Sequence, residues 1–146
     1  MITIDELKTR WKLDCLIDDV DIQKASVDSP RLHARYLGYL IDAKTELRKS
    51  ANQCISLRKE LIRYYSGLFT KEELDEKGWT QYQGKKPLKG ELETMISAYP
   101  VYVELENRMN ELEILIEALE SIIKELYQRS YIIKNIIQAR IFEAGV

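Results

Sequence analysis

The sequence predicts an all-α protein whose long, coiled-coil-like helices can pair as a hairpin. Glycine and proline are scarce, at six and three in 146 residues, so few positions would interrupt a helix. Charged residues make up 32% of the chain, a share typical of helix-rich and coiled-coil proteins. Apolar residues also recur at alternating spacings of three and four in two long runs. That is the pattern of helices that pack along one face.

The first element is a short helix inside an acidic N-terminal segment, residues 1–29. This segment carries four basic and seven acidic side chains. Thr3 followed by Glu6 is a capping box, which predicts a helix that begins there and runs to about Asp14. The mixed composition of residues 15–29 does not decide whether they form a further helical turn.

The second element is a long basic helix at 30–66. Ser29 followed by Pro30 predicts its start, and Gly67 predicts its end because glycine readily adopts the left-handed conformation after a last turn. The helix carries eight Lys and Arg against three acids. Its three-four stripe consists of His33, Tyr36, Leu40, Ala43, Leu47, Ser50, Cys54, Leu57, Leu61 and Tyr64.

Residues 67–99 are predicted to be a loop with short helices. Thr70 and Glu73 indicate a second capped helix that ends at Gly78. The stretch "WTQYQGKKPLKG" has the composition of a loop, and "ELETMISA" is helical again up to Tyr99.

The last element is a helix at 100–142, which Pro100 can open. After Tyr131 it is apolar on nearly every side, and such a helix must be covered on every side. We therefore expect one domain over residues 1–146 that associates with itself through this helix. The residues expected at that contact are Leu126, Ile133, Ile136, Ile137 and Ile141.

Several function classes lack support in the sequence. The start "MITIDELKTRW" has no signal-peptide pattern, and no apolar run approaches the roughly 20 residues of a membrane span, so a soluble, intracellular protein is expected. Two distant cysteines and one histidine give no metal-ligand spacing. His33 lies on the helical stripe, which favours a packed histidine over a catalytic base, and no phosphate-binding glycine loop is present. We expect no enzyme activity, no metal and no cofactor.

The basic helix instead indicates nucleic acid as a ligand. Arg58, Lys59 and Arg63 fall within two turns, with Arg48 and Lys49 upstream, and such a cluster can neutralise phosphates. The alternative is an ordinary solvated helix face. Single-strand binders add aromatic side chains on which bases stack, and the aromatic and basic residues available for this are Tyr65, Trp79, Tyr82, Lys85, Lys86 and Lys89. Tyr64 is expected in the core, and Trp79 could equally anchor its loop.

Several short motifs, taken in order, resemble the UvsY-type recombination mediator family of tailed bacteriophages. They are the acidic stretch "DCLIDDVDIQKAS", a basic helix that ends in "YYSG", a short basic loop, a helix that ends in "ISA", and a final helix that closes with "RIFEAG". Together they cover nearly the whole chain.

The resemblance implies a helical, non-enzymatic protein that forms a closed homo-oligomeric ring of six or seven copies and binds single-stranded DNA. It also implies contacts with a RecA-like recombinase and with a single-strand DNA-binding protein, in the cytoplasm of an infected host cell. A basic pair just before the double tyrosine supports DNA binding in that family, which here points to Arg58 or Lys59, with Arg63 as the nearest second charge. The alternative is a coiled-coil scaffold that binds only proteins.

Overall fold

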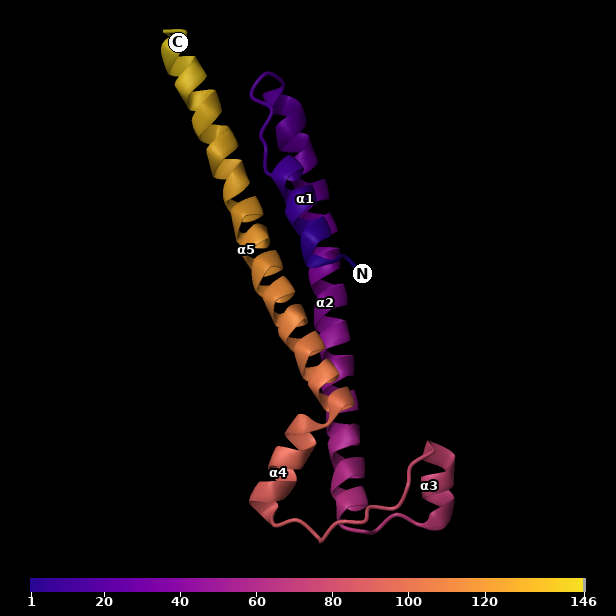
Figure 1. Ribbon diagram of the computed structural model, residues 1–146. Helices are drawn as coiled ribbons and strands as arrows, with labels where there is room; N and C mark the ends of the chain where they lie inside the picture. The colour runs from indigo at the N-terminus through magenta and orange to yellow at the C-terminus, as the bar shows by residue number, and fades with distance from the viewer. Residues whose placement is uncertain (146) are drawn as a thin grey trace. The chain divides into compact units, whose positions relative to one another are not determined.

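The protein is all-α, as the sequence predicts. The computed structural model describes residues 1–145, and every regular element in that range is a helix (Figure 1). The helices are α1 (Ile4–Asp14), α2 (Ile22–Tyr65), α3 (Lys71–Lys77), α4 (Lys89–Ala98) and α5 (Pro100–Glu143). None of them, within residues 1–145, is long and apolar enough to cross a bilayer.

The chain divides into two compact units. Unit 1 comprises Met1–Glu46 and Leu112–Val146, and unit 2 comprises Leu47–Glu111. The division falls inside α2 and α5, so each long helix contributes residues to both units. That residues 1–146 form a single domain therefore stays a prediction.

The start of α2 differs from the sequence prediction. The helix begins at Ile22, and Pro30 lies inside it. Asp21 caps the earlier start, because its carboxylate accepts a hydrogen bond from the Lys24 backbone N–H (3.1 Å) and its carbonyl accepts one from Ala25 (3.2 Å). Pro30 cannot donate a backbone hydrogen bond, and the helix continues across this one missing bond. Sequence reasoning failed here because proline is far more common at a helix start than inside one.

The other helix boundaries follow the sequence prediction. Thr3 and Glu6 form the capping box of α1, and the Thr70 side chain caps α3. Gly67 and Gly78 adopt positive φ angles of 71° and 67°, which end α2 and α3. The predicted loop 79–90 is free of helix up to Leu88, and α4 begins at Lys89, two residues earlier than predicted. α5 begins at Pro100, as predicted.

The core of unit 1 lies between antiparallel stretches of α2 and α5, with α1 packed beside them (Figure 1). The Tyr36 and Leu119 side chains are fully buried, and an ion pair joins Lys44 on α2 to Glu120 on α5 (3.3 Å). His33 is half-buried with its ring 5.1 Å from that of Tyr127, in keeping with a packed histidine. Further core residues are Leu40, Ala43, Leu112, Leu115, Ile116, Ile122, Leu126 and Ile133.

A buried polar cluster fixes the end of α1 in unit 1. The Tyr36 hydroxyl and the Arg35 guanidinium both donate to the Asp14 carboxylate, at 2.7 and 3.1 Å. Burial and this hydrogen bond raise the pKa of Tyr36, so it stays a neutral donor at physiological pH. The buried Arg129 of α5 donates to the carbonyls of Asp14 and Leu16, both at 3.1 Å. A cation thus satisfies carbonyls at and just beyond the carboxyl end of α1.

Replacing Arg129 tests this cluster. Arg129→Met would leave two carbonyls without their charged donor, so we expect the free energy of unfolding to fall by about 3 kcal/mol in urea denaturation. Arg108→Met, at an exposed position of the same helix, should change it by less than about 0.5 kcal/mol. Equal effects of the two substitutions would mean that the Arg129 hydrogen bonds contribute little.

Candidate nucleic-acid interface

Every predicted DNA-contacting residue lies in unit 2, and three of them share one exposed face of α2. Arg48, Asn52, Ile55, Lys59 and Arg63 follow one another at spacings of three and four, so their side chains lie on the same side of the helix. All five residues are exposed. We call this surface the cationic face. It extends about 22 Å along the helix axis, and none of its five residues is acidic.

The three cations of this face differ in their partners. Within residues 1–145, neither Arg48 nor Lys59 has a carboxylate within ion-pair distance. Arg63 pairs with Glu73 of α3, where one guanidinium nitrogen donates to both carboxylate oxygens at 2.9 and 3.0 Å. The Arg63 guanidinium also lies 5.0 Å from the centre of the Phe69 ring. Two cations are thus open to solvent anions, and the third is already engaged.

Arg58 is placed differently from its neighbours. It lies about 100° around the helix from Lys59 and forms an ion pair with Glu93 of α4. This hydrogen bond and the negative charge of Glu93 raise the pKa of Arg58. The predicted cluster of Arg58, Lys59 and Arg63 is therefore split between two sides of α2. Lys49 is exposed, but it is turned about 100° around the helix from Arg48, in the direction opposite to Arg58, so it lies outside the cationic face.

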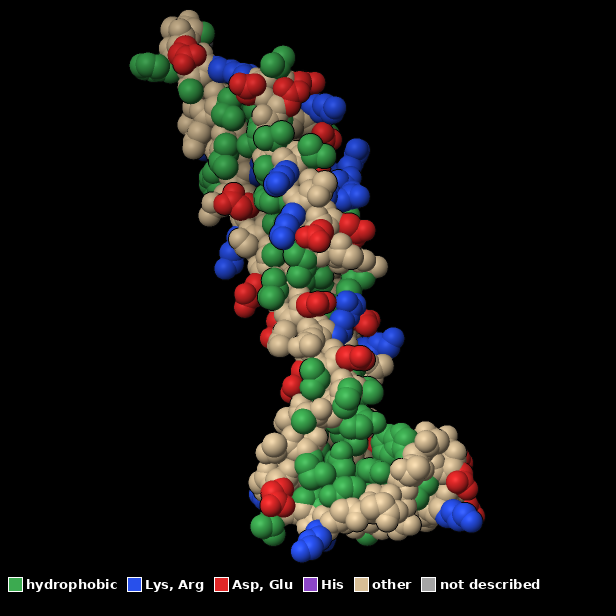
Figure 2. Space-filling view, viewed as in Figure 1, with side chains coloured by type: hydrophobic (Ala, Val, Ile, Leu, Met, Phe, Trp, Pro, Cys, Tyr) green, Lys and Arg blue, Asp and Glu red, His purple; other side chains and the backbone are tan. Residues whose placement is uncertain are grey.

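An aromatic cluster packs at the carboxyl end of α2. Tyr64 is at its centre, and its hydroxyl donates to the Thr80 carbonyl at 2.5 Å. The Trp79 ring stacks on Phe69, with centroids 5.7 Å apart and planes at 20°. Figure 2 shows hydrophobic side chains gathered on the visible face of unit 2. The rings that contact one another are those of Tyr64, Tyr65, Phe69, Trp79, Tyr82 and Tyr99.

The contacts in this cluster support a loop-anchoring role for Trp79. Trp79 packs against Tyr64 and Phe69, so it anchors its loop. Tyr65 is half-buried, with its ring edge-on to that of Tyr82 at 5.1 Å, and burial raises its pKa. The sequence predicts that Tyr64 packs in the core and that Tyr65 is freer to contact a base, but in the structure both rings pack within the cluster.

The loop after Trp79, which also belongs to unit 2, carries two exposed lysines. Lys85 and Lys86 are both exposed, and the Lys85 carbonyl accepts a hydrogen bond from the Tyr82 hydroxyl at 3.2 Å. Gly84 lies against the Tyr82 ring, where an added Cβ would collide with the phenol. The tyrosine and the glycine together fix the backbone from which the two lysines project.

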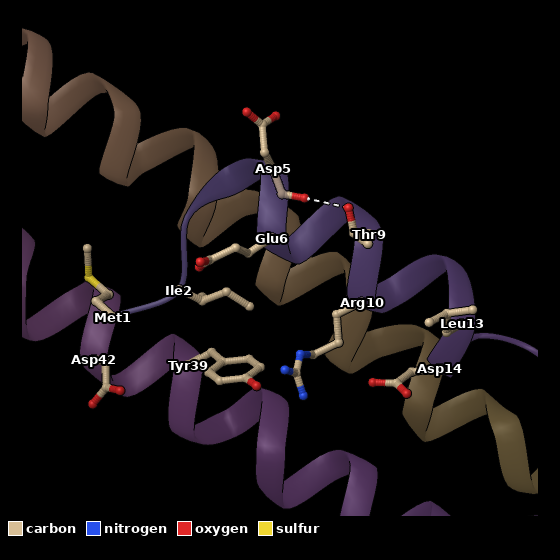
Figure 3. A pocket seen from close by; sticks show the side chains of 10 residues that line it. All are labelled: Met1, Ile2, Asp5, Glu6, Thr9, Arg10, Leu13, Asp14, Tyr39 and Asp42. Carbon is tan, nitrogen blue, oxygen red and sulfur yellow. Dashed lines mark hydrogen bonds between the residues drawn. The ribbon is translucent and has the colours of Figure 1, made fainter.

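A concave surface in unit 1 lies between α1 and α2 (Figure 3). It encloses about 900 Å³, and the Arg10 side chain points into it. None of the sequence-predicted site residues lines it. Four carboxylates against one guanidinium give it an acidic balance that disfavours phosphate: Asp5, Glu6, Asp14 and Asp42 with Arg10. Within residues 1–145, no group of three or more His, Cys, Asp or Glu side chains could hold a metal ion.

Comparison with known proteins gives one consistent relationship. The model of a family described as "Recombination, repair and ssDNA binding protein UvsY" matches residues 10–146. A recombination protein, uvsY of Enterobacteria phage T4, is 27% identical over 143 residues, which cover 97% of this chain and 98% of that protein.

Solved structures show the same fold. One crystal structure of the bacteriophage T4 recombination mediator protein UvsY superposes with a TM-score of 0.83 at 23% identity, covering 99% of this chain and all of that one. A second crystal form gives a TM-score of 0.80 at 22% identity over 94% and 98% of the two chains.

The anchoring role of Trp79 is testable by stability. Trp79→Ala removes ring contacts to Tyr64, Phe69 and Tyr99, so we expect the free energy of unfolding to fall by about 2–3 kcal/mol, below the value for a fully buried tryptophan. Tyr131→Ala, at an aromatic side chain that is 68% exposed, is the matched control and should cost under about 0.5 kcal/mol. If the Trp79 variant is as stable as this control, Trp79 does not anchor its loop.

Proposed function

Since the chain belongs to the UvsY family of recombination, repair and single-stranded DNA-binding proteins, we propose that it is a recombination mediator that binds single-stranded DNA. It would act in the cytoplasm of an infected host cell, where it promotes loading of a RecA-like recombinase onto DNA coated by single-strand DNA-binding protein. The observation that carries the DNA-binding part is the cationic face of α2, with Arg48 and Lys59 exposed and free of carboxylates within residues 1–145.

Phosphate neutralisation would supply most of the affinity. Each cation that contacts a phosphate releases a condensed counterion, and the logarithm of the affinity falls by about 0.7 per contact for each tenfold rise in salt. Arg48, Lys59 and Arg63 together would give a slope of about −2 for each copy of the chain. Lys85 and Lys86 would add to it if the strand also reaches the loop.

Self-association would turn this weak site into a strong one. Several copies in a ring of six or seven raise the effective concentration of cationic faces along one strand without any new contact. Leu126 and Ile133 are buried in unit 1 and Ile136 is half-buried, so among the residues predicted for oligomerisation the exposed ones are Ile137 (41%) and Ile141 (47%). These two would carry the contact between copies.

A ring with bound DNA also explains how a mediator could work without catalytic chemistry. A strand that follows several cationic faces is held in a path set by the protein. A coating protein that needs a different path would bind that strand less tightly, which would favour its replacement by the recombinase. Contacts with both of those proteins remain part of the proposal.

The alternative function is a coiled-coil scaffold that binds only proteins. It draws support from the ion pairs Arg58–Glu93, Arg63–Glu73 and Lys44–Glu120, in which acidic residues of this chain already occupy its cations. A scaffold predicts no salt-dependent affinity for DNA.

Removal of the cationic face separates the two functions. Arg48→Ala with Lys59→Ala and Arg63→Ala should lower affinity for a labelled oligodeoxythymidylate at least tenfold and flatten the salt slope by about 2, as measured by fluorescence anisotropy. The matched control removes three exposed lysines of unit 1, in Lys24→Ala, Lys124→Ala and Lys134→Ala. Equal losses of DNA affinity in both triple variants would mean that net charge alone sets the affinity. An unchanged salt slope in the first variant would mean that DNA does not bind at the cationic face.

The contact between copies is tested by charge. Ile137→Asp with Ile141→Asp would place unpaired carboxylates in an apolar interface, so the mass from light scattering should fall toward that of one chain. Leu37→Asp with Ile41→Asp changes two exposed apolar residues on α2, next to the stretch that pairs with Glu120 of α5, and should leave the mass unchanged. An intact oligomer in the isoleucine variant would exclude these residues from the interface.

A further inference from the structure

We propose that Glu73 and Glu93 are positioning residues that set the affinity of the α2 site, because each holds an arginine that phosphate must take over. The proposal rests on the proposed binding of single-stranded DNA and names the residues that limit it. Glu73 comes from α3 and Glu93 from α4, two short helices of unit 2 on either side of the anchored loop.

The pair between Arg63 and Glu73 is well formed but open to exchange. One guanidinium nitrogen donates to both carboxylate oxygens, at 2.9 and 3.0 Å. The Arg63 side chain is 48% exposed and that of Glu73 is 34% exposed, so water and anions reach both groups. Exposed ion pairs of this kind are weak, and a phosphate group offers the guanidinium an equivalent pair of oxygens. A passing strand can therefore displace Glu73.

The pair between Arg58 and Glu93 hides a cation from the exposed face. Arg58 lies about 100° around α2 from Lys59, and its side chain is 36% exposed while that of Glu93 is 46% exposed. With Glu93 charged, Arg58 remains engaged toward α4. Loss of that charge would free a guanidinium that lies one position along the chain from an unpaired lysine.

A third pair neutralises an acid of α2. Lys77 of α3 donates to the Glu60 carboxylate at 2.8 Å, so the one acidic residue between Arg58 and Arg63 is itself neutralised. α3 thus offsets both an acid and a base of α2. Of the three cations at 58, 59 and 63, only Lys59 keeps an uncompensated charge within residues 1–145.

The functional consequence is a site that binds DNA with fewer charges than its sequence offers. A mediator has to give up its DNA to another protein, and a carboxylate that returns to its arginine would assist that release. Glu73 and Glu93 would set the balance between holding and releasing the strand.

The experiment measures affinity and salt slope together. Glu73→Gln with Glu93→Gln removes both charges and keeps side-chain size, and glutamine at position 73 still suits the third residue of a capped helix. With labelled oligodeoxythymidylate, the variant should bind roughly two- to fivefold more tightly for each freed arginine at low salt. The salt slope should steepen by about 0.7, because Arg58 gains a phosphate contact that Glu93 denies it in the parent. Arg63 already exchanges Glu73 for phosphate in the parent, so its release raises affinity without adding to the slope.

Two further variants separate this role from other effects. Glu76→Gln with Glu104→Gln makes the same change in net charge at exposed glutamates of unit 2 that have no ion pair within residues 1–145, and it should leave the slope unchanged. Glu73→Asp with Glu93→Asp restores both charges and should return the slope toward that of the parent. Glu93→Gln alone should reproduce the steeper slope, and Glu73→Gln alone should raise the affinity at the slope of the parent. Circular dichroism checks that each single variant keeps its helix content.

The outcomes are distinct. A steeper slope in the Gln variant alone supports the proposal. A parent chain that binds DNA and a Gln variant with the same slope would overturn it while the proposed function stands. The same shift in both Gln pairs would assign the effect to net charge and also overturn it. Absence of binding by the parent and by every variant would overturn both proposals.

Discussion

Ion pairing of two α2 arginines with glutamates of neighbouring short helices is the constraint on which the proposed DNA site depends. Arg58 and Arg63 lie at the end of a helix whose sequence offers a dense positive charge, yet each is engaged by a glutamate from a neighbouring short helix. Both pairs remain partly exposed, so they are exchangeable and cost little to break. Arg48 and Lys59 complete the exposed face without a carboxylate partner within residues 1–145.

Other contacts of unit 2 hold α3 and the segment that follows it in place. Tyr64 and Trp79 hold the segment between α3 and α4, and the caps at Thr70 and Gly78 fix the ends of α3, so Glu73 projects from a defined position. Different contacts stabilise unit 1. There, Arg129 satisfies carbonyls at the end of α1, and an apolar stripe continues to exposed residues that can meet another copy. The predicted DNA-binding residues and the predicted oligomerisation residues thus fall in different units.

The sequence predicted most of the fold because its signals are local. Capping residues at 3 and 70 and glycines at 67 and 78 act within one turn, and the structure places helix ends there. Pro30 misled because its usual position outweighed the weaker cap at Asp21. The site was predicted as a set of cations with nearby aromatic residues, without their partners. No local pattern shows that Glu93 reaches back 35 positions to Arg58, or that Arg129 contacts a carbonyl at position 14. Such long-range pairs depend on tertiary packing.

The most direct measurement is a footprint of the arginines themselves. Phenylglyoxal modifies accessible guanidinium groups, and mass spectrometry of the modified peptides reports each arginine separately. If phosphate replaces carboxylate on α2, saturating single-stranded DNA should protect Arg63 and Arg48 strongly and Arg58 in part, and it should leave Arg108 on α5 as reactive as in the free protein. Protection at Arg108 with unchanged reactivity at Arg48 and Arg63 would place the DNA elsewhere and contradict the account.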